Sequence, residues 1–599
     1  MAEDTTGSTS PFIVIGIDYG TTYSGAAWAK SGALHQVEVI SQWSSQTIGA
    51  TDSDKVPSDI AYDEYDRPSK WGFGLQASDT AIRWVKLLLS PLSLSALNTQ
   101  EEKVVELTAR HLREIGKTAV EVIADYLRFL WSHILARLRV RLTAPVLDNM
   151  VLKVVLTVPA IWDHGAQQQM RKAAKQAGIL DPRACGQTEI TLIAEPAAAA
   201  LATYHDAEIR LNPAIEPGDS FVVCDAGGGT VDLISYTIQS FDPFRLSECI
   251  GATGDLCGAV YVDREFLKHI HTYRRHMRSL SRETEKRFME REWENNIKRN
   301  FDGTAGPWLI DTPPNQHNRR MKAMRSVFKK EESTVLQWTG EHVREIFAEV
   351  VPKIIDLLRD QVQGIKDATG SPPKVIILVG GFGGNRYLLD QVQQNFKHMD
   401  IEIQQPTRSW SAVCRGAVHR GVQGGDRIVT NHISKFYYGV LYQTPWEEGK
   451  FLLADKEFDA RRQIWQAINQ MDWYLRKSEN VLKILDVEHC FTAVYEAPEE
   501  LSNQRYDIYY SDHDDPGTRL AHHTRRLCKL RFDLSNFSFT SFPVYMNSLG
   551  KEYRLVRCIL RMAPTVSSLD WEIWCQGKRV KPVVEYENTQ TEEAAKRPT

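Results

Sequence analysis

The sequence predicts an α/β domain over residues 11–425 and a mainly β domain over residues 426–585. The chain of 599 residues exceeds what one hydrophobic core usually supports. In the first part, short apolar strands alternate with amphipathic helices. In the second part, hydrophobic residues recur with a period of two, which is typical of half-exposed strands. We therefore expect two domains of different structural class.

Four apolar segments predict the buried strands of the first domain. Each is rich in β-branched residues and ends in small or turn-forming residues, as strands buried on both faces do. Apolar residues at helical spacing predict helices over residues 120–134 and 343–357. The strand segments are IVIGIDYG from Ile13, KVVLTVPA from Lys153, SFVVCDAGG from Ser220 and KVIILVGG from Lys374.

Alternating hydrophobic residues predict strands in the second domain, most clearly over residues 506–510, 530–534 and 571–575. The segment KEFDARRQIWQAINQMDWYLRK departs from this alternation and indicates a helix or a long excursion among the strands. We expect an inserted helical segment over about residues 451–477. The polar ends of the chain, residues 1–10 and 586–599, predict disorder.

Charge and cysteine content exclude some classes of function. The net charge of −4 argues against general binding of nucleic acid, because no large field of one sign is available. The start of the chain lacks the pattern of a signal peptide, and no apolar run is long enough for a membrane span. Nine cysteines without a CxxC pair predict a reduced chain with no zinc site. We expect a cytoplasmic protein that could also enter the nucleus.

The segment IGIDYGTTYSG predicts a phosphate-binding hairpin. Asp18 lies near the end of a predicted buried strand. The chain then turns at Gly20, Thr21 and Thr22 and enters a second strand. Backbone N–H groups and hydroxyls in such a turn can converge on phosphate oxygens. A carboxylate at the strand end can hold Mg²⁺ through water. An ordinary hairpin has the same pattern, so this segment alone leaves both interpretations open.

The segment FVVCDAGGGTVDLISY repeats this pattern about 200 residues later. Asp225 follows a buried strand, and Gly227, Gly228, Gly229 and Thr230 follow Asp225. The repetition argues against a chance hairpin. It favours two related half-domains that hold one polyphosphate from opposite sides.

A third glycine-rich segment, VIILVGGFGGNRYLL, joins a buried strand to a helix. Its glycines, Gly380, Gly381, Gly383 and Gly384, would let a flat ring approach the backbone closely. The pattern GxxxxGK[ST] of a P-loop is absent, and GxGxxG does not follow a strand as dinucleotide-binding folds require. The three segments together indicate a nucleotide site of another type.

With the segment LIAEPAAAALA, these motifs resemble those of the heat shock protein 70 family, in particular its divergent member-12-like branch. IDYGTTYSG is similar to the family's first phosphate motif, DAGGGTVDL to its second, LVGGFGGNRYL to its adenosine motif and LIAEPAAAALA to its connecting helix. The resemblance implies a two-lobed actin-like (ribonuclease H-like) ATPase domain over residues 11–425. Lobe I would comprise about residues 11–215 and 390–425, and lobe II about residues 216–389. The following β domain would resemble a substrate-binding sandwich.

The resemblance also implies roles for the matching residues, with ATP or ADP and Mg²⁺ as ligands. Asp18 and Asp225 would hold hydrated Mg²⁺, and Lys86 and Glu195 would place the attacking water. These four residues and Thr230 would form the catalytic set. The residues implied to contact the nucleotide are Gly20, Thr21, Thr22, Tyr23, Gly227, Gly228, Gly229, Thr230, Glu294, Lys298, Gly380, Gly381, Phe382 and Gly383.

Two of these assignments have structural alternatives. Lys86 could be a surface lysine of a helix. Glu195 is also a carboxylate of the kind favoured at a helix start, beside Pro196 in the first turn. Both readings of Glu195 can hold together.

The adenosine motif departs from the family pattern. Phe382, Gly383 and Gly384 stand where the family has serine, threonine and an arginine that stacks on adenine. Phe382 could replace that stacking, Arg386 could reach back, or Phe382 could pack beneath the loop. The family's adenine-side pair falls on Glu294 and Lys298 with a spacing that differs by one residue.

The second domain departs further from the family, because no helical lid follows its strands. The candidate linker RIVTNHISKFYYGV has only Ile428 and Val429 as an apolar centre. We expect a slow ATPase whose nucleotide state is coupled to binding of a polypeptide client. A nucleotide sensor or scaffold with negligible hydrolysis is one alternative. A small-molecule kinase of the same superfamily is another, although no acidic base for a second substrate is identified.

Overall fold

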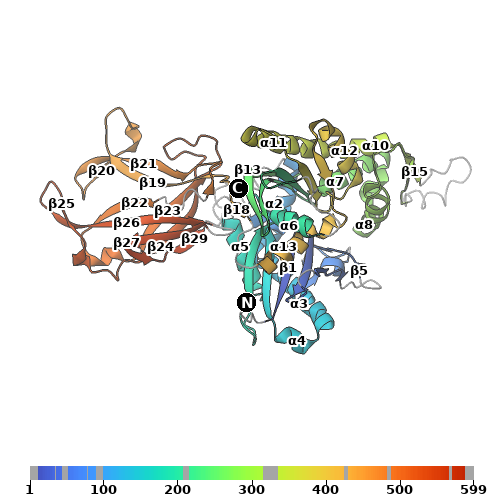
Figure 1. Ribbon diagram of the computed structural model, residues 1–599, viewed down its shortest axis with the longest axis horizontal. Helices are drawn as coiled ribbons and strands as arrows, with labels where there is room; N and C mark the ends of the chain where they lie inside the picture. Colours follow the sequence, from blue (N-terminus) through green and yellow to red (C-terminus); the bar gives the residue numbers. More distant parts are fainter. Residues whose placement is uncertain are drawn as a thin grey trace, which may run out of the picture. The chain divides into compact units, whose positions relative to one another are not determined.

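The computed structural model divides the protein into two compact units (Figure 1). The first unit comprises Met1–Arg245 and Ala252–Ile428, and the second comprises Leu246–Gly251 and Val429–Thr599. The structure describes residues 11–33, 36–43, 51–76, 78–89, 99–162, 164–206, 215–313, 335–423, 429–481, 488–564 and 569–586. The ends expected to be disordered lie outside these residues, except for Tyr586, which is the last residue of a strand.

The first unit contains a six-stranded sheet built around the strand that carries Asp18. Its strands are β1 (Phe12–Tyr19), β2 (Tyr23–Lys30), β3 (Glu38–Val39), β6 (Val56–Pro57), β9 (Val151–Val158) and β10 (Glu189–Ala194). β1 forms an antiparallel hairpin with β2 and pairs in parallel with β9, which pairs in parallel with β10. β3 and β6 pair with β2. The strands predicted from Ile13 and Lys153 are confirmed.

A second six-stranded sheet repeats this order around the strand that carries Asp225. Its strands are β11 (Ser220–Ala226), β12 (Val231–Phe241), β13 (Phe244–Asp255), β16 (Val375–Val379), β17 (Glu402–Gln404) and β18 (Val429–Asn431). β11 forms an antiparallel hairpin with β12 and pairs in parallel with β16, which pairs in parallel with β17. The predicted strands from Ser220 and Lys374 are confirmed, and both sheets place a hairpin beside two parallel strands.

The pairing of β17 corrects the expected lobe boundary. Lobe I was expected to resume at about residue 390, but β17 extends the second sheet along the free edge of β16. A parallel partner needs a crossover, and α12 (Arg386–Phe396) supplies it. The chain returns to the first sheet only with α13 (Ala412–Gln423), which packs on β1 and α6 (Glu195–His205).

The described part of the first unit contains eight further α-helices, of which α11 packs on β11 and β12. They are α2 (Thr99–Glu114), α3 (Ala119–Leu142), α4 (Ala144–Asp148), α5 (His164–Gln176), α7 (Ala259–Tyr273), α8 (Arg282–Phe288), α10 (Gly340–Phe347) and α11 (Val351–Thr369). The helix predicted over residues 120–134 is confirmed as part of α3, which begins at a capping box between Thr118 and Glu121. The helix predicted over residues 343–357 is two helices, because Pro352 lies in the first turn of α11 and cannot continue α10.

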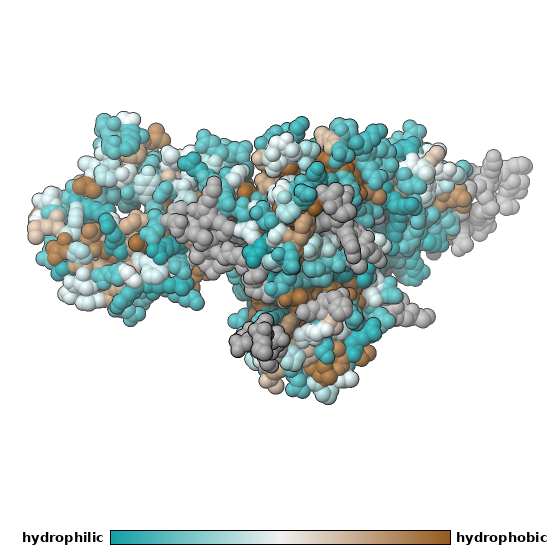
Figure 2. All heavy atoms as spheres, in the orientation of Figure 1, coloured by the Kyte–Doolittle hydropathy of each residue, from teal (hydrophilic) through white to brown (hydrophobic). Residues whose placement is uncertain are grey.

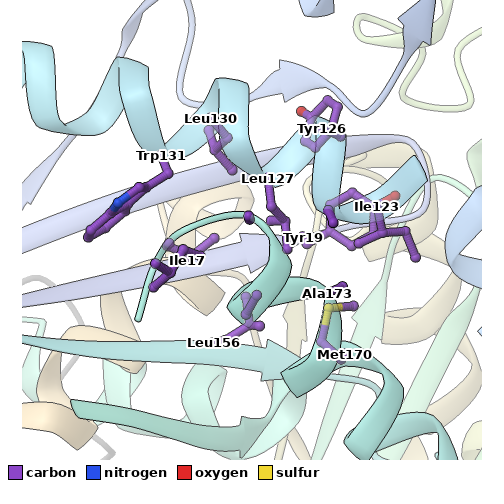
Figure 3. Close-up of a cluster of buried hydrophobic side chains, with 14 of the residues drawn as sticks. Ile17, Tyr19, Ile123, Tyr126, Leu127, Leu130, Trp131, Leu156, Met170 and Ala173 are labelled. Atoms are coloured by element: carbon purple, nitrogen blue, oxygen red, sulfur yellow. The ribbon is translucent and has the colours of Figure 1, made fainter. Parts of the chain in front are cut away.

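The core beneath the first sheet joins β1 and β9 to α3 and α5 (Figure 3). Ile17 and Tyr19 of β1 meet Ile123, Leu127 and other apolar residues of α3, all of them buried. Removal of such side chains from water is the main stabilising contribution to a core of this kind. This packing holds β1, and therefore Asp18 near its end, in a fixed position.

Helix α13 crosses α6 at a contact that only glycine permits. A Cβ atom on Gly416 would lie 1.6 Å from the carbonyl oxygen of Ala198. A Cβ atom on Gly16 of β1 would lie 2.2 Å from the carbonyl oxygen of Cys414 on α13. The absence of side chains at these two positions lets the backbones approach.

The second unit consists of two antiparallel sheets and short connections. One contains β19 (Tyr437–Pro445), β20 (Lys456–Asp459), β21 (Ile464–Leu475), β23 (Gln504–Ser511), β24 (Arg525–Phe532) and β29 (Val583–Tyr586). The other contains β22 (Glu488–Tyr495), β25 (Val544–Met546), β26 (Glu552–Pro564), β27 (Leu569–Cys575) and β28 (Lys578–Val580). The predicted mainly β character is confirmed.

The inserted helical segment expected over residues 451–477 is wrong. These residues form β20 and β21, and β21 pairs with β19. Register shifts interrupt that pairing, and Asn469 has a positive φ of 60°. Buried Ala467, Met471 and Leu475 are four residues apart, a spacing that is compatible with one face of a strand as well as with one face of a helix.

Within the described residues, none of the helices combines the length and the apolar character needed to cross a bilayer. Hydrophilic residues cover most of the face shown in Figure 2, and hydrophobic residues form separate patches.

Candidate functional site

A cavity of about 370 Å³ lies in the first unit where the loops after β1, β11 and β16 meet. Gly20, Thr21 and Thr22 contribute from the first hairpin, and residues 227–230 contribute from the second. Asp18 and Asp225 both line this cavity. Two loops from different sheets therefore open onto one space.

The two hairpin loops approach each other closely. A Cβ atom on Gly228 would lie 2.0 Å from the Oγ1 atom of Thr22, and one on Gly229 would lie 3.0 Å from the Cγ2 atom of Thr21. Larger residues at these glycines would close the space between the loops. Backbone N–H groups and threonine hydroxyls can thus donate hydrogen bonds to a phosphate chain from both sides.

Lys86 and Glu195 form a buried ion pair in the cavity wall. Lys86 donates from Nζ to the Oε1 atom of Glu195 over 2.5 Å, and the Lys86 side chain is 3% exposed. Lys86 lies in the 3-10 helix Val85–Leu89, so the interpretation as a surface lysine is wrong. Glu195 is the first residue of α6, as its structural alternative expects, and it also lines the cavity. Its role toward an attacking water stays a prediction.

Burial raises the pKa values of two carboxyl groups in the cavity. Burial raises the pKa of Glu195 to about 8, against the opposing effect of Lys86. Burial also raises the pKa of Asp225 to about 7, and the nearby positive charge of Lys55 opposes the rise. A cation bound near these carboxyl groups would stabilise their ionised forms and lower both pKa values. The cavity therefore favours an additional positive charge.

The part of the cavity between the two hairpin loops, called the phosphate end below after its predicted ligand, carries an excess of carboxyl groups. Four carboxyl groups face two ammonium groups there, which leaves an excess of two carboxyl groups. Within the described residues, no group of three or more carboxylate, histidine or cysteine side chains is arranged to hold a metal ion, so Mg²⁺ would have to be held through water. The residues in this balance are Asp18, Glu195, Asp225, Asp232, Lys55 and Lys86.

The opposite end of the cavity carries a second set of ion pairs. The Nζ atom of Lys298 lies 2.8 Å from the Oδ1 atom of Asp263 and 2.9 Å from the Oε2 atom of Glu294. Glu294 and Lys298 lie on the π-helical segment Met289–Lys298. A π-helix accommodates an extra residue, which accounts for the one-residue difference in spacing noted in the sequence.

Aromatic rings adjoin these ion pairs. The rings of Tyr23 and Trp410 meet edge to face at 5.6 Å, and the guanidinium of Arg299 lies 5.9 Å from the centre of the Trp410 ring. All three residues line the cavity. This end offers flat apolar surfaces beside charged groups, and the phosphate end offers glycine loops and carboxylates.

Comparison with known proteins shows the family. The family model described as "Hsp70 protein" matches residues 14–425. The chain belongs to the Hsp70 family. This confirms the resemblance and the actin-like ATPase domain expected from the motifs.

Similarity to two Hsp70 relatives extends over most of the chain. Heat shock 70 kDa protein 12A of Homo sapiens is 24% identical over 620 residues, covering 89% of this chain and 86% of the relative. Heat shock 70 kDa protein 12B of Homo sapiens is 26% identical over 523 residues, covering 72% and 71%. A chaperone protein HscA homolog of Acinetobacter baylyi is 29% identical over 226 residues, covering 37% and 32%. The resemblance to the member-12-like branch is thereby confirmed.

The third glycine-rich loop of this Hsp70 protein differs in detail from the expected site. Gly380, Gly381 and Phe382 line the cavity, but Gly383 does not. A Cβ atom on Gly383 would lie 1.8 Å from the carbonyl oxygen of Val379. Only a residue without a side chain fits there, so Gly383 permits the tight turn of the loop. Gly384 and Asn385 line the cavity instead.

Phe382 packs beneath its loop. Its side chain is buried, and its ring lies against that of Phe347 with centres 6.3 Å apart. This arrangement agrees with the third interpretation of Phe382. Arg386 begins α12 and is not among the residues that line the cavity.

Several cavity residues were missed in the sequence. Asp232 closes the repeated DAGGGTVD pattern, and its spacing from Asp225 could have identified it. Lys55 and Trp410 lie in polar segments without a recognisable pattern. Only the folded chain brings these two residues to the cavity.

We expect Trp410→Ala to weaken binding of ADP by about 5- to 150-fold, because stacking of a base on an aromatic ring contributes roughly 1–3 kcal/mol. Isothermal titration calorimetry with Mg²⁺ and ADP measures the change. Trp446→Ala is a matched control, since Trp446 lies in the second unit. Unchanged affinity in Trp410→Ala would remove Trp410 from the nucleotide site.

Proposed function

We propose that this Hsp70-family protein binds ATP with Mg²⁺ in the cavity of its first unit and hydrolyses it slowly to ADP and phosphate. The nucleotide state would change the affinity of the second unit for a polypeptide. One observation carries the proposal: two glycine-rich loops and the Lys86–Glu195 pair meet in a single cavity. Phosphoryl transfer requires little beyond such positioning and neutralisation of charge.

Each group near the phosphate end has a task that its chemistry supports. The Gly227–Thr230 loop and Thr21 would donate N–H and O–H groups to phosphate oxygens. Lys86 would donate to the terminal phosphate and orient a water molecule, and Glu195 would accept a proton from that water. Asp18 and Asp225 would hold the hydrated Mg²⁺, which supplies charge neutralisation when bound.

Exposed apolar side chains in the second unit support binding of a polypeptide. Trp465 is 53% exposed on β21, and Met546 is 62% exposed on β25. Asn547 donates from Nδ2 to the carbonyl oxygen of Arg461 over 3.0 Å, which connects the end of β25 to the β20–β21 turn. Exposed apolar groups on neighbouring elements are typical of interaction surfaces. Other exposed residues in these segments are Phe458, Ile464, Val544 and Leu549.

The raised pKa of Glu195 supports a second candidate function. Burial raises the pKa of Glu195 and favours its protonated form, whereas the ion pair with Lys86 opposes this shift. A protonated Glu195 cannot accept a proton from water. A nucleotide sensor that binds ATP without turnover would result if nucleotide binding leaves this pKa unchanged.

We expect Asp225→Asn to lower the single-turnover rate of ATP hydrolysis by about 100-fold or more, because one of the two carboxylates proposed to hold the charge-neutralising Mg²⁺ is lost. Release of inorganic phosphate is measured with and without an unfolded polypeptide. Asp356→Asn is the control, since Asp356 is an exposed residue of α11. Equal rates for Asp225→Asn and wild type would contradict the ATPase assignment.

The same experiment separates the candidate functions. A wild-type protein that binds ATP but releases no phosphate would be a sensor. A rate or nucleotide affinity that does not respond to unfolded polypeptide would argue against coupling between nucleotide and client.

A further inference from the structure

Lys55 places an ammonium group inside the phosphate end of the cavity. Its Nζ atom lies 2.6 Å from the Oδ2 atom of Asp18, and its side chain is 9% exposed. Lys55 lines the cavity together with Asp225. A lysine buried to this extent is unusual unless it is paired.

The backbone around Lys55 holds it in place. The next residue, Val56, belongs to β6 and pairs with Ser24 of β2. Ser53 donates from Oγ to the carbonyl oxygen of Lys55 over 2.9 Å. A Cβ atom on Gly25 would lie 3.1 Å from the Cγ atom of Lys55, so the stem passes directly over this glycine. These contacts constrain the backbone and the aliphatic part of Lys55, so its ammonium group has a defined position.

The surroundings keep Lys55 charged. Its ammonium group is in contact with the carboxylate of Asp18, and Asp225 lines the same cavity. Neighbouring carboxylates favour the charged form of a lysine.

Both oxygens of the Asp18 carboxylate have partners from the protein. Thr157 donates from Oγ1 to Oδ1 over 3.1 Å, and Lys55 donates to Oδ2. A buried ion pair can serve the fold alone. Lys55 differs from such a pair because it also lines the cavity and lies near the second aspartate. Without Lys55, four carboxyl groups would face one ammonium group, and the excess would rise from two to three.

We propose that Lys55 is a built-in cation of the nucleotide site. Its ammonium group supplies part of the charge neutralisation that Mg²⁺ would otherwise provide. Nucleotide binding therefore depends only weakly on Mg²⁺. The proposal rests on the proposed function of this cavity as a nucleotide site. Lysine suits the role because its ammonium is a compact point charge on a long stem. Mg²⁺ would remain useful, since an excess of carboxyl groups persists with Lys55 in place.

The test measures the dissociation constant for ADP twice by titration calorimetry on the full chain, once in EDTA and once with saturating Mg²⁺. The quantity compared between variants is the constant in EDTA divided by the constant in Mg²⁺. For wild type we expect a ratio below about 10, and for Lys55→Met a ratio above about 100, because loss of a nearby charge matters most without the metal. A lysine needed only for the fold would change both constants equally.

Two further variants sharpen the result. Lys55→Arg keeps the charge and should keep a ratio close to that of wild type. Lys70→Met is the matched control, because Lys70 pairs with Asp79 outside the cavity. If Lys55→Met does not fold, the ratios of wild type and Lys55→Arg decide the question.

Each contrary outcome has a separate meaning. A wild-type ratio above about 100 would overturn the role of Lys55, as would equal loss of affinity by Lys55→Met in both conditions. Failure of wild type to bind ADP even with Mg²⁺ would overturn the nucleotide site itself, and this proposal with it.

Discussion

Lys86→Ala is expected to lower single-turnover hydrolysis of ATP by about 10²- to 10³-fold, the range found when one preorganised donor is removed from a reacting centre. Lys86 is held by the buried Oε1 atom of Glu195 and by the nearby ring of Trp162, 5.6 Å from Nζ. Its loss removes a positive charge from the phosphate end and leaves Glu195 without its ion-pair partner. ATP binding should be less affected, because the glycine loops remain.

Quenched-flow measurement of phosphate release, with ATP affinity measured in parallel, tests this expectation. Lys268→Ala is the control, since Lys268 pairs with Glu265 on the exposed side of α7. The double variant Lys86→Ala, Glu195→Gln should be scarcely slower than Lys86→Ala, because residues that act as a unit are not additive. Hydrolysis at the wild-type rate by Lys86→Ala would show that the pair has no part in the reaction.

Gly416→Ala is expected to destabilise the first unit by about 3 kcal/mol or more, because overpacking against an immovable backbone exceeds the usual cost of an added methyl group. The added Cβ would lie 1.6 Å from the carbonyl oxygen of Ala198, so α13 and α6 must separate. Helix α6 begins at Glu195, and α13 follows shortly after Trp410. Separation of these helices should weaken nucleotide binding as well as stability.

Thermal unfolding followed by circular dichroism, with and without ADP, measures both effects. Gly74→Ala is the matched control, because no atom lies within 4 Å of its Cβ position, and its midpoint should remain close to that of wild type. An unchanged midpoint and unchanged ADP stabilisation in Gly416→Ala would mean that the close crossing of α13 and α6 does not exist in solution.

Local sequence patterns identified most of the fold of the first unit. The apolar segments that end at Asp18 and Asp225 are strands, as predicted. The glycine loops after them lie together in one cavity. Such features are readable because buried strands and tight turns depend on a few consecutive residues. The expected helix over residues 451–477 was wrong because a four-residue spacing of apolar residues fits one face of a strand as well as one face of a helix.

Other parts of the site depend on chain segments that are distant in the sequence. Lys55 resembles a solvated lysine in a polar segment until β6 pairs with β2 and directs it to Asp18. Trp410 reaches Tyr23 only after the second sheet and α13 are assembled. Phe382 could have stacked on a ligand or packed inward, and its contact with Phe347 decided the matter.

The sequence by itself determined the family, the two aspartate-led glycine loops and the class of each domain, because these are carried by short runs of neighbouring residues. Tertiary structure alone decided which cations face the aspartates, which rings border the cavity, and where the chain returns to the first sheet. The physical reason is that burial, pairing of charges and ring contacts arise between residues far apart in the chain.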